Sequence, residues 1–503
     1  MQINTNSIRF HRESTQKQTV SPTPKQQGDT VKLGSTQQQF SFVTPHEMSA
    51  VFGKGRAVLT EGAAYHREQA YQILDGLLEA RDQTAGLLPM HVRTENGKMV
   101  AADHAASGID MGRQTAGLVM AARVAEASGD QARADKYIQA AEQNYQAGKE
   151  LLAEGNIFVH MRNFNDDGSV ASTNLGEPGR SAEGQDNVTR VNPRAYAFRA
   201  AGELYQATGE EQYKADFSRY FDAWVKDFHD PEHGGFFVHS NLERAGDHTT
   251  RDSISGRDGA AVEYDGSAGV KGNDGTVYGL SSVLLTANEV LGTPRTQKLV
   301  KESMDIILDR FERADGMLWE NYTADFKPIA VGWQSQPREN GQPSHVAIGG
   351  HTAMAPQQII EGARQLKSQG AISQEEYDRY IDRSLSLFQD FTESGAVDWE
   401  SGAVHNAMRV EEPDRDKRWI ENWGDAGWQQ AELLQSLVRF KQEGRLEQLK
   451  GPAGKDGFDL LKSAQGHYEE NYSMPTEYSF DGFANPDPYH RPQVAQYFQE
   501  ALG

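Results

Sequence analysis

The sequence predicts an all-α protein in which six helix hairpins close into an (α/α)6 barrel, with short β-hairpins in the loops at one end. Three observations support this prediction: a helical hydrophobic pattern that recurs along the chain, a more apolar helix between its copies, and long loops of unequal length. We expect one barrel domain over residues 41–503, preceded by a flexible polar tail over residues 1–40.

The recurring unit is a helix with one apolar face. Its apolar residues follow steps of 4, 3 and 4, the spacing of a single helix face, before a glycine turn and a short apolar run. These runs are too short to build a large sheet. Repetition of this kind indicates one supersecondary unit used several times. Clear copies cover residues 217–238, 300–319 and 381–399, and a weaker copy covers residues 141–159.

More apolar helices separate these copies and predict a second layer. Together the two kinds of helix make about twelve helices, or six hairpins, which fit an open solenoid or a closed toroid. Solenoids usually have short loops, whereas residues 155–190 and 239–273 form long ones, which favours the closed barrel and a site built by loops. The apolar helices are expected over residues 117–127, 195–207, 277–290, 363–366 and 431–440.

Composition limits the partners and the compartment. The formal charge of −22 disfavours phosphate backbones and anionic lipid, so we expect neither nucleic acid nor membrane as a partner. The absence of cysteine excludes disulfides, thiolate metal sites and cysteine nucleophiles. Residues 1–32 lack the apolar stretch of a secretory signal, so we expect a cytoplasmic protein. The sequence leaves the oligomeric state open, with a homodimer as one possibility.

Two histidines lie where a loop meets the expected start of a helix. His351 follows a Gly-Gly turn, which would expose its imidazole to a cavity, although a histidine that only caps or packs at a helix end is the alternative. His490 follows a proline-rich approach, and Pro492 suits the first turn of the last helix. A histidine pKa near ~6.5 suits both base and acid at neutral pH.

Tryptophan and arginine motifs add candidate sugar contacts. Trp423 and Trp428 lie beside carboxylates, and could stack on a sugar whose hydroxyls bind Glu432, although core packing explains the tryptophans equally well. Arg113 precedes an expected apolar helix, where it could polarise a carbonyl oxygen or simply lie on a solvated face.

In their order along the chain, these motifs resemble the N-acylglucosamine 2-epimerase family. That family includes cellobiose 2-epimerases and aldose–ketose isomerases, and its fold is an (α/α)6 barrel. The resemblance covers roughly residues 60–503. It rests on Arg113-Gln114 before a helix, Asn192-Pro193 and Gly350-His351 at helix starts, Trp428-Gln-Gln-Ala-Glu432, and Tyr489-His490 near the end.

The resemblance implies a reaction at C2 of a reducing sugar. It assigns proton exchange to His351 and His490, and polarisation of the substrate oxygen to Arg113. Histidines on opposite faces allow epimerisation, whereas proton return to the neighbouring carbon gives an isomerase. If Arg113 stabilises the enediolate, no metal is required, and no nucleotide-cradling glycine loop indicates a cofactor. The expected substrate contacts are Asn192, Tyr196, Trp423, Trp428, Glu432 and Tyr489.

Three positions depart from the family pattern. Tyr196 replaces a common histidine, and Met354 replaces the glutamate that usually follows the Gly-His motif by three residues. Gln493 stands where the terminal Tyr-His-x-x-Arg motif has its arginine. Loss of an orienting carboxylate should change the basicity or position of His351. The sugar, the outcome of the reaction and catalysis itself therefore stay open.

Two other functions stay open. A glycoside hydrolase on the same barrel would need two carboxylates about 5–9.5 Å apart. Glu263, Asp265 or Asp274 could supply one, and Asp425 or Glu432 the other. A catalytically inactive sugar-binding or scaffold protein, with the polar tail as its contact, is the third function.

Overall fold

The computed structural model divides into two units, Met1–Gly53 and Lys54–Gly503, and the description below concerns the second. The predicted tail and its boundary at residues 40 and 41 lie outside the described residues, so both stay predictions. The described residues are 45–81, 86–96, 98–102, 105–165, 169–174, 188–241, 269–313, 315–329, 335–337, 343–410, 427–472 and 488–502.

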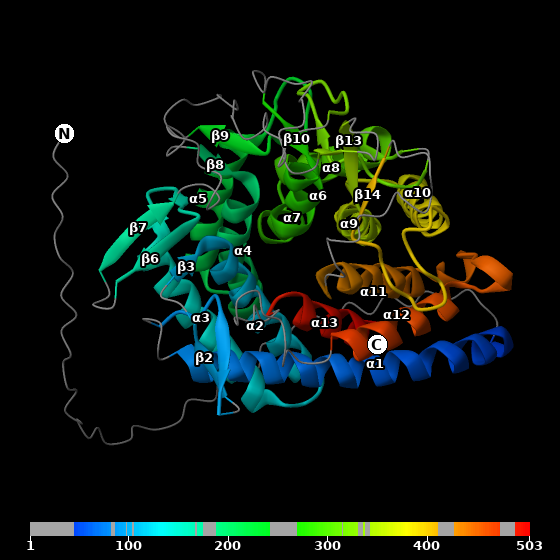
Figure 1. Ribbon diagram of the computed structural model, residues 1–503, viewed down its shortest axis with the longest axis horizontal. Helices are drawn as coiled ribbons and strands as arrows, with labels where there is room; N and C mark the ends of the chain where they lie inside the picture. Colours follow the sequence, from blue (N-terminus) through cyan, green and yellow to red (C-terminus); the bar gives the residue numbers. More distant parts are fainter. Residues whose placement is uncertain are drawn as a thin grey trace. The chain divides into compact units, whose positions relative to one another are not determined.

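Six helical segments form an inner set whose contacts make a closed cycle. Each segment contacts the next one along the chain, and α13 contacts α2 (Figure 1). Most of their residues are buried, as expected for helices that are apolar on nearly all sides. The inner segments are α2 (Gly108–Ala127), α4 (Val191–Thr208), α6 (Asn273–Gly279) with the π-helical turn Leu280–Leu284 and α7 (Leu285–Leu291), α9 (Gly349–Ser368), α11 (Gly427–Gln442) and α13 (His490–Leu502).

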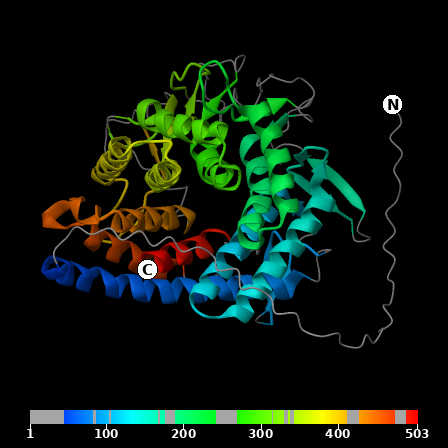
Figure 2. The ribbon, with the colours of Figure 1, turned by 180° about the vertical axis from the view of Figure 1, so that it is seen from behind.

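The outer helices are amphipathic and pack on this inner set with one face. On α5 the predicted stripe of Phe217, Phe221, Trp224 and Phe228 is fully buried, which confirms the periodicity there. Figure 2 shows α1 alongside α12 and α13, and His66 of α1 donates to Gln465 of α12. The outer helices are α1 (Pro45–Ala80), α3 (Gln131–Leu152), α5 (Glu211–Phe228), α8 (Pro294–Ile306) with the π-helical turn Ile307–Phe311, α10 (Gln374–Glu393) and α12 (Gly457–Asn471), with short 3-10 turns at Leu446–Gln448 and Pro452–Gly454.

Two glycines of α2 permit close packing within the inner set. A Cβ at Gly112 would lie 2.0 Å from the carbonyl oxygen of Tyr196 on α4. A Cβ at Gly117 would lie 1.7 Å from the carbonyl oxygen of Pro488, just before α13. Only glycine fits at such distances, so these two positions set how near α4 and the start of α13 approach α2.

Short antiparallel strands lie in the loops between the helices, and four of them lead directly into inner helices. β3, β8, β10 and β13 each lead directly into α2, α4, α6 and α9. The sheets are β1-β2, β3-β6-β7, β4-β5, β8-β9, β10-β11 and β12-β13-β14. Their strands are β1 (Val92–Glu95), β2 (Lys98–Ala101), β3 (Ala105–Ser107), β4 (Ala153–Glu154), β5 (Ile157–Phe158), β6 (Met161–Phe164), β7 (Val170–Asn174), β8 (Val188–Arg190), β9 (His239–Asn241), β10 (Lys271–Gly272), β11 (Asn321–Tyr322), β12 (Ser335–Pro337), β13 (Pro343–Ile348) and β14 (Ala407–Arg409).

All five inner helices whose bounds the hydrophobic pattern predicted begin earlier than expected, and the difference is largest for α2 and α9. α2 begins at Gly108 instead of residue 117, so Arg113 lies inside the helix and not before it. α9 begins at Gly349 and continues through Pro356, so residues 363–366 are only its last part. Glycines and polar residues interrupt the apolar pattern near the start of both helices, and for this reason the pattern missed these parts. Among the described residues, no helix has the length and apolar character needed to cross a bilayer.

Candidate active site

The first turns of the inner helices surround a cavity of about 380 Å³. This volume lies within the range of small-molecule sites. Every inner segment contributes at least one lining residue, and the β-strands and loops before the helices contribute the rest. The lining residues are Ile109, Arg113, His160, Arg190, Asn192, Pro193, Asp274, Tyr278, Ile348, His351, Asn406, Trp428 and His490.

His351 lies in the first turn of α9 and is fixed by a buried carboxylate. Its Nδ1 donates to Oε2 of Glu320 at 2.7 Å, and both side chains are 5% exposed or less. The other oxygen, Oε1 of Glu320, accepts from the backbone N–H of Ile348 at 3.0 Å. Burial lowers the pKa of His351, but Glu320 and then Asp274 and Glu432 raise it, and the net pKa is raised.

Trp428 brings the second histidine to the same cavity. The ring centroid of Trp428 lies 5.7 Å from that of His351 and 6.4 Å from that of His490. Nε2 of His490 lies 3.8 Å from Oε1 of Glu432, whose other oxygen accepts from Gln357. His490 is almost fully buried, so both imidazoles are directed inward from separate helices.

Arg113 lines the cavity and rests on two tyrosines. Its guanidinium lies 4.5 Å from the ring centroid of Tyr196 and 5.9 Å from that of Tyr489. The hydroxyl of Tyr489 accepts from Nη1 of Arg199 at 2.5 Å. Because neither tyrosine lines the cavity, both are placed to hold Arg113 from behind, with the charged group left at the cavity wall.

A polar group on the α4 side binds Asp274. Nδ2 of Asn192 donates to Oδ1 of Asp274 at 3.0 Å, and Arg190 pairs with the other oxygen. Burial raises the pKa of Asp274, but Arg190 and then His351 lower it, and the net pKa is lowered. Burial and then Arg190 lower the pKa of His160 to about 4, so this imidazole is neutral at physiological pH.

Some buried polar atoms of this cavity have no hydrogen-bond partner within the described part of the chain, and two of them belong to uncharged side chains. These two are Oδ1 of Asn192 and Nδ1 of His160, and both side chains are more than nine-tenths buried. An unpaired buried polar group costs about 1–3 kcal/mol, so such groups mark where a ligand or water is bound. The cavity is therefore suited to a polar ligand rich in hydrogen-bonding groups.

The structure brings most of the predicted site residues together. His351, His490, Arg113, Asn192 and Trp428 line the cavity, whereas the remaining described ones pack directly behind it. Those behind it are Tyr196, Tyr489 and Glu432. Trp423 lies outside the described residues, as do Glu263, Asp265 and Asp425 of the hydrolase alternative.

The sequence analysis missed several lining or supporting residues: Glu320, Arg190, His160, Tyr278 and Asn406. Glu320, Arg190, His160 and Asn406 lie in strands or loops, where hydrophobic periodicity carries no information about direction, whereas Tyr278 lies within α6. Glu320 follows the short apolar run at residues 317–319. Its position next to a predicted hairpin was the one sequence feature that could have indicated a site residue there. No group of three or more metal-ligating side chains with suitable geometry occurs within the described ranges.

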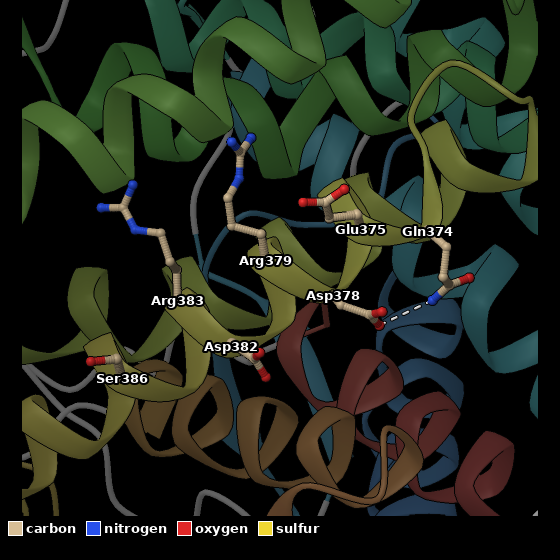
Figure 3. A pocket seen from close by; sticks show the side chains of 7 residues that line it. All are labelled: Gln374, Glu375, Asp378, Arg379, Asp382, Arg383 and Ser386. Carbon is tan, nitrogen blue, oxygen red and sulfur yellow. Dashed lines mark hydrogen bonds between the residues drawn. The ribbon is translucent and has the colours of Figure 1, made fainter.

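A second hollow, on the outer surface of α10, differs from this cavity. Its volume is about 740 Å³, yet a single helix supplies all of its lining side chains. Figure 3 shows these side chains spread along the helix surface instead of converging, and Gln374 donates to Asp378 within the same helix at 3.0 Å. A solvated face of one helix offers no enclosed site. The lining residues are Gln374, Glu375, Asp378, Arg379, Asp382, Arg383 and Ser386.

The fold is that of sugar epimerases and isomerases. No family model and no curated protein matches the sequence. Among solved structures, cellobiose 2-epimerase from Spirochaeta thermophila matches with a TM-score of 0.60 at 14% identity, over 89% of this chain and 98% of that one. Cellobiose 2-epimerase from Bacillus thermoamylovorans matches with a TM-score of 0.62 at 13% identity, over 87% and 98%.

A D-mannose isomerase matches with a TM-score of 0.57 at 13% identity, over 86% of this chain and 97% of that one. At such low identity the similarity shows the fold and not the activity. The predicted resemblance to the N-acylglucosamine 2-epimerase family is thus confirmed in the fold.

Proposed function

We propose that this protein is an enzyme that epimerises or isomerises a reducing sugar at C2, in the cavity of an (α/α)6 barrel. The closed cycle of inner helices and the outer helices packed on it support the barrel. The observation that carries the function is that His351 and His490, from separate helices, both line one cavity and both contact Trp428. The fold shared with cellobiose 2-epimerases and a D-mannose isomerase adds support.

The chemistry begins with the open-chain sugar. One imidazole removes the proton from C2, and the electron pair moves into the C1 carbonyl to form an enediolate. Arg113 stabilises the negative oxygen, because a buried guanidinium stays charged. If the second imidazole returns a proton to C2 from the opposite face, the product is the epimer. If the hydroxyl proton on O2 instead moves to O1 and a proton is returned to C1, the product is the ketose.

The hydrolase alternative fits the described carboxylates poorly. A glycosidase needs one carboxylic acid that is protonated at the pH of the reaction. Asp274 has a lowered pKa because Arg190 pairs with it, so it is ionised. Glu432 lies behind His490 and accepts from Gln357 instead of lining the cavity. Neither carboxylate is placed as a general acid.

An isotope-exchange experiment tests the proposed function. The protein is incubated in D2O with free aldoses, N-acylhexosamines and β-linked disaccharides, and deuterium at C2 is followed by NMR. We expect exchange at C2 with at least one sugar, and its loss in His351→Asn and His490→Asn. Release of new reducing ends without C2 exchange would instead establish a hydrolase. If neither signal is observed, the catalytically inactive sugar-binding protein is the function that remains.

A further inference from the structure

We propose that Glu320 is a positioning residue for His351, and that it supplies, from the loop position just before β11, the carboxylate that this chain lacks at position 354. The inference rests on the proposed function, because it gives His351 the role of a catalytic base. Met354 is a buried, apolar residue in the hydrophobic core, so this position on the helix of His351 supplies no carboxylate.

Both oxygens of Glu320 are engaged in a way that fixes the imidazole. One accepts from Nδ1 of His351 at 2.7 Å, and the other accepts from the backbone of Ile348, the residue before α9. The carboxylate therefore binds the backbone just before the helix and the side chain in its first turn. Hydrogen bonds at both oxygens leave the carboxylate little rotational freedom. The imidazole of His351, which is bound to it, is therefore also held in one orientation.

The backbone around Glu320 is held equally firmly. Its carbonyl oxygen accepts from the N–H of Asn273 at 3.1 Å, and the next residues pair with β10. On the other side, the N–H of Leu318 donates to Oγ1 of Thr352 in α9 at 3.1 Å. The segment is therefore attached to both α6 and α9, the two helices that carry Asp274 and His351.

Close approach at Gly272 also fixes the segment. A Cβ at Gly272 would lie 2.5 Å from the carbonyl oxygen of Glu320, so this contact requires glycine. The neighbouring Lys271 is fully buried, and its ammonium donates to the carbonyl oxygens of Gly234 and Ala324 at 2.7 Å. These contacts anchor the strand pair that presents Glu320.

The geometry has a defined chemical consequence. Because Nδ1 of His351 carries the proton donated to Glu320, the lone pair lies on Nε2, the nitrogen left for the substrate. When Nε2 takes the C2 proton, the imidazolium forms beside a carboxylate that stabilises it. Glu320 thus sets the tautomer and raises the basicity of His351 without touching the substrate.

The test compares Glu320→Gln with Glu302→Gln, a matched variant. Glu302 also binds a histidine, since its Oε1 lies 2.8 Å from Nε2 of His229, but neither residue lines the cavity. Glu320→Gln keeps the size and removes the charge, and Glu320→Asp keeps the charge. Thermal unfolding of each variant establishes that it folds.

The first readout is an ¹⁵N NMR titration of the histidines without substrate. We expect Glu320→Gln to lower the pKa of His351 and to mix its two tautomers, whereas Glu302→Gln leaves both unchanged. The second readout is the pH profile of C2 exchange. Its acidic limb should move to lower pH in Glu320→Gln, with a loss in rate of about 10- to 100-fold, and Glu320→Asp should recover part of the rate.

The two readouts separate this inference from the proposed function. If His351 titrates identically in the wild type and in Glu320→Gln, the inference is overturned whatever the activity. If the titration shifts but no sugar exchanges at C2 in any variant, Glu320 controls the imidazole as described and the proposed function is what fails. A rate loss in Glu320→Gln with an unmoved pH profile would show a merely structural role, and would also overturn the inference.

Discussion

The inner helices end in two different polar environments. At their N-terminal ends, charged and polar side chains surround a cavity, and Oδ1 of Asn192 and Nδ1 of His160 have no partner among the described residues. At their C-terminal ends, the polar side chains pair with one another across neighbouring helices. Glu203 of α4, for example, accepts from Arg199 at 2.9 Å and pairs with Arg123 of α2 at 3.1 Å.

The same pairing continues around the C-terminal ends. Gln206 and Gln365 both donate to Glu289, Asn288 donates to Gln365, and Arg439 pairs with Glu361 and Glu500. Buried polar residues alone therefore do not identify the site, because both ends contain them. The cavity end differs in its open volume of about 380 Å³, which leaves room for a ligand.

Arg113→Met should give the largest functional effect. Loss of the cation that stabilises the enediolate should reduce the kcat/KM of C2 exchange by about 100- to 1000-fold. The guanidinium rests on the rings of Tyr196 and Tyr489, on which a methionine side chain can still pack, so the free energy of unfolding should change little. Urea unfolding and D2O exchange measure the two quantities. A large loss of stability in Arg113→Met would contradict the assignment of the N-terminal ends of the inner helices to function and of their C-terminal ends to stability.

Glu203→Gln should give the largest effect on stability. It leaves Arg199 and Arg123 with a neutral partner at a site that is about 4% exposed, and breaking a buried pair of this kind costs about 3 kcal/mol. Chemical denaturation measures the loss. Arg439→Met, at the same end of α11, is expected to leave the kcat/KM of C2 exchange unchanged, and a change there would contradict the assignment of this end to structure.

Two neutral, buried histidines should make the protein less stable as the pH falls. Burial lowers the pKa of His160 and of His66 to about 4, so the unfolded chain binds protons below pH 6.5 that the folded chain does not. Their stabilisation is complete above pH 6.5 and is lost as pH falls towards 4. Each shift corresponds to about 3 kcal/mol at most.

His160→Gln and His66→Gln should each flatten this decline in unfolding free energy, measured by urea titrations between pH 7 and pH 4. Only His160 lines the cavity, since His66 packs between α1 and α12. His160→Gln should therefore also raise the KM of C2 exchange, whereas His66→Gln should not. An equal effect of both on KM would mean that His160 has no contact with substrate.

Asn192→Ala should give the smallest effect. It removes one amide that faces the ligand and one hydrogen bond to Asp274, so KM should rise by about 10-fold with a smaller change in kcat. Asn192→Asp places a negative charge beside Asp274 and should weaken binding further. Steady-state kinetics separate KM from kcat, and an unchanged KM in both variants would remove Asn192 from the substrate contacts.

Local sequence signals predicted the helices and part of the site. The 4, 3, 4 spacing at residues 217–228 indicates one buried face of α5, because the period of a helix is a property of neighbouring residues. The glycine turn before His351 and the prolines around His490 predicted helix starts, and α9 and α13 do begin there. Tyr196, for which the sequence predicts a substrate contact, lies against the guanidinium of Arg113, and its contact with substrate stays a prediction.

The sequence by itself determined where helices form, that they alternate between two layers, and which histidines stand at their N-termini, since these depend on contacts within a few residues. Only the tertiary structure decided that Glu320, 31 residues before His351, supplies its carboxylate. That choice depends on the pairing of β10 with β11 and on the packing of α6 against α9. No local periodicity encodes such a long-range contact.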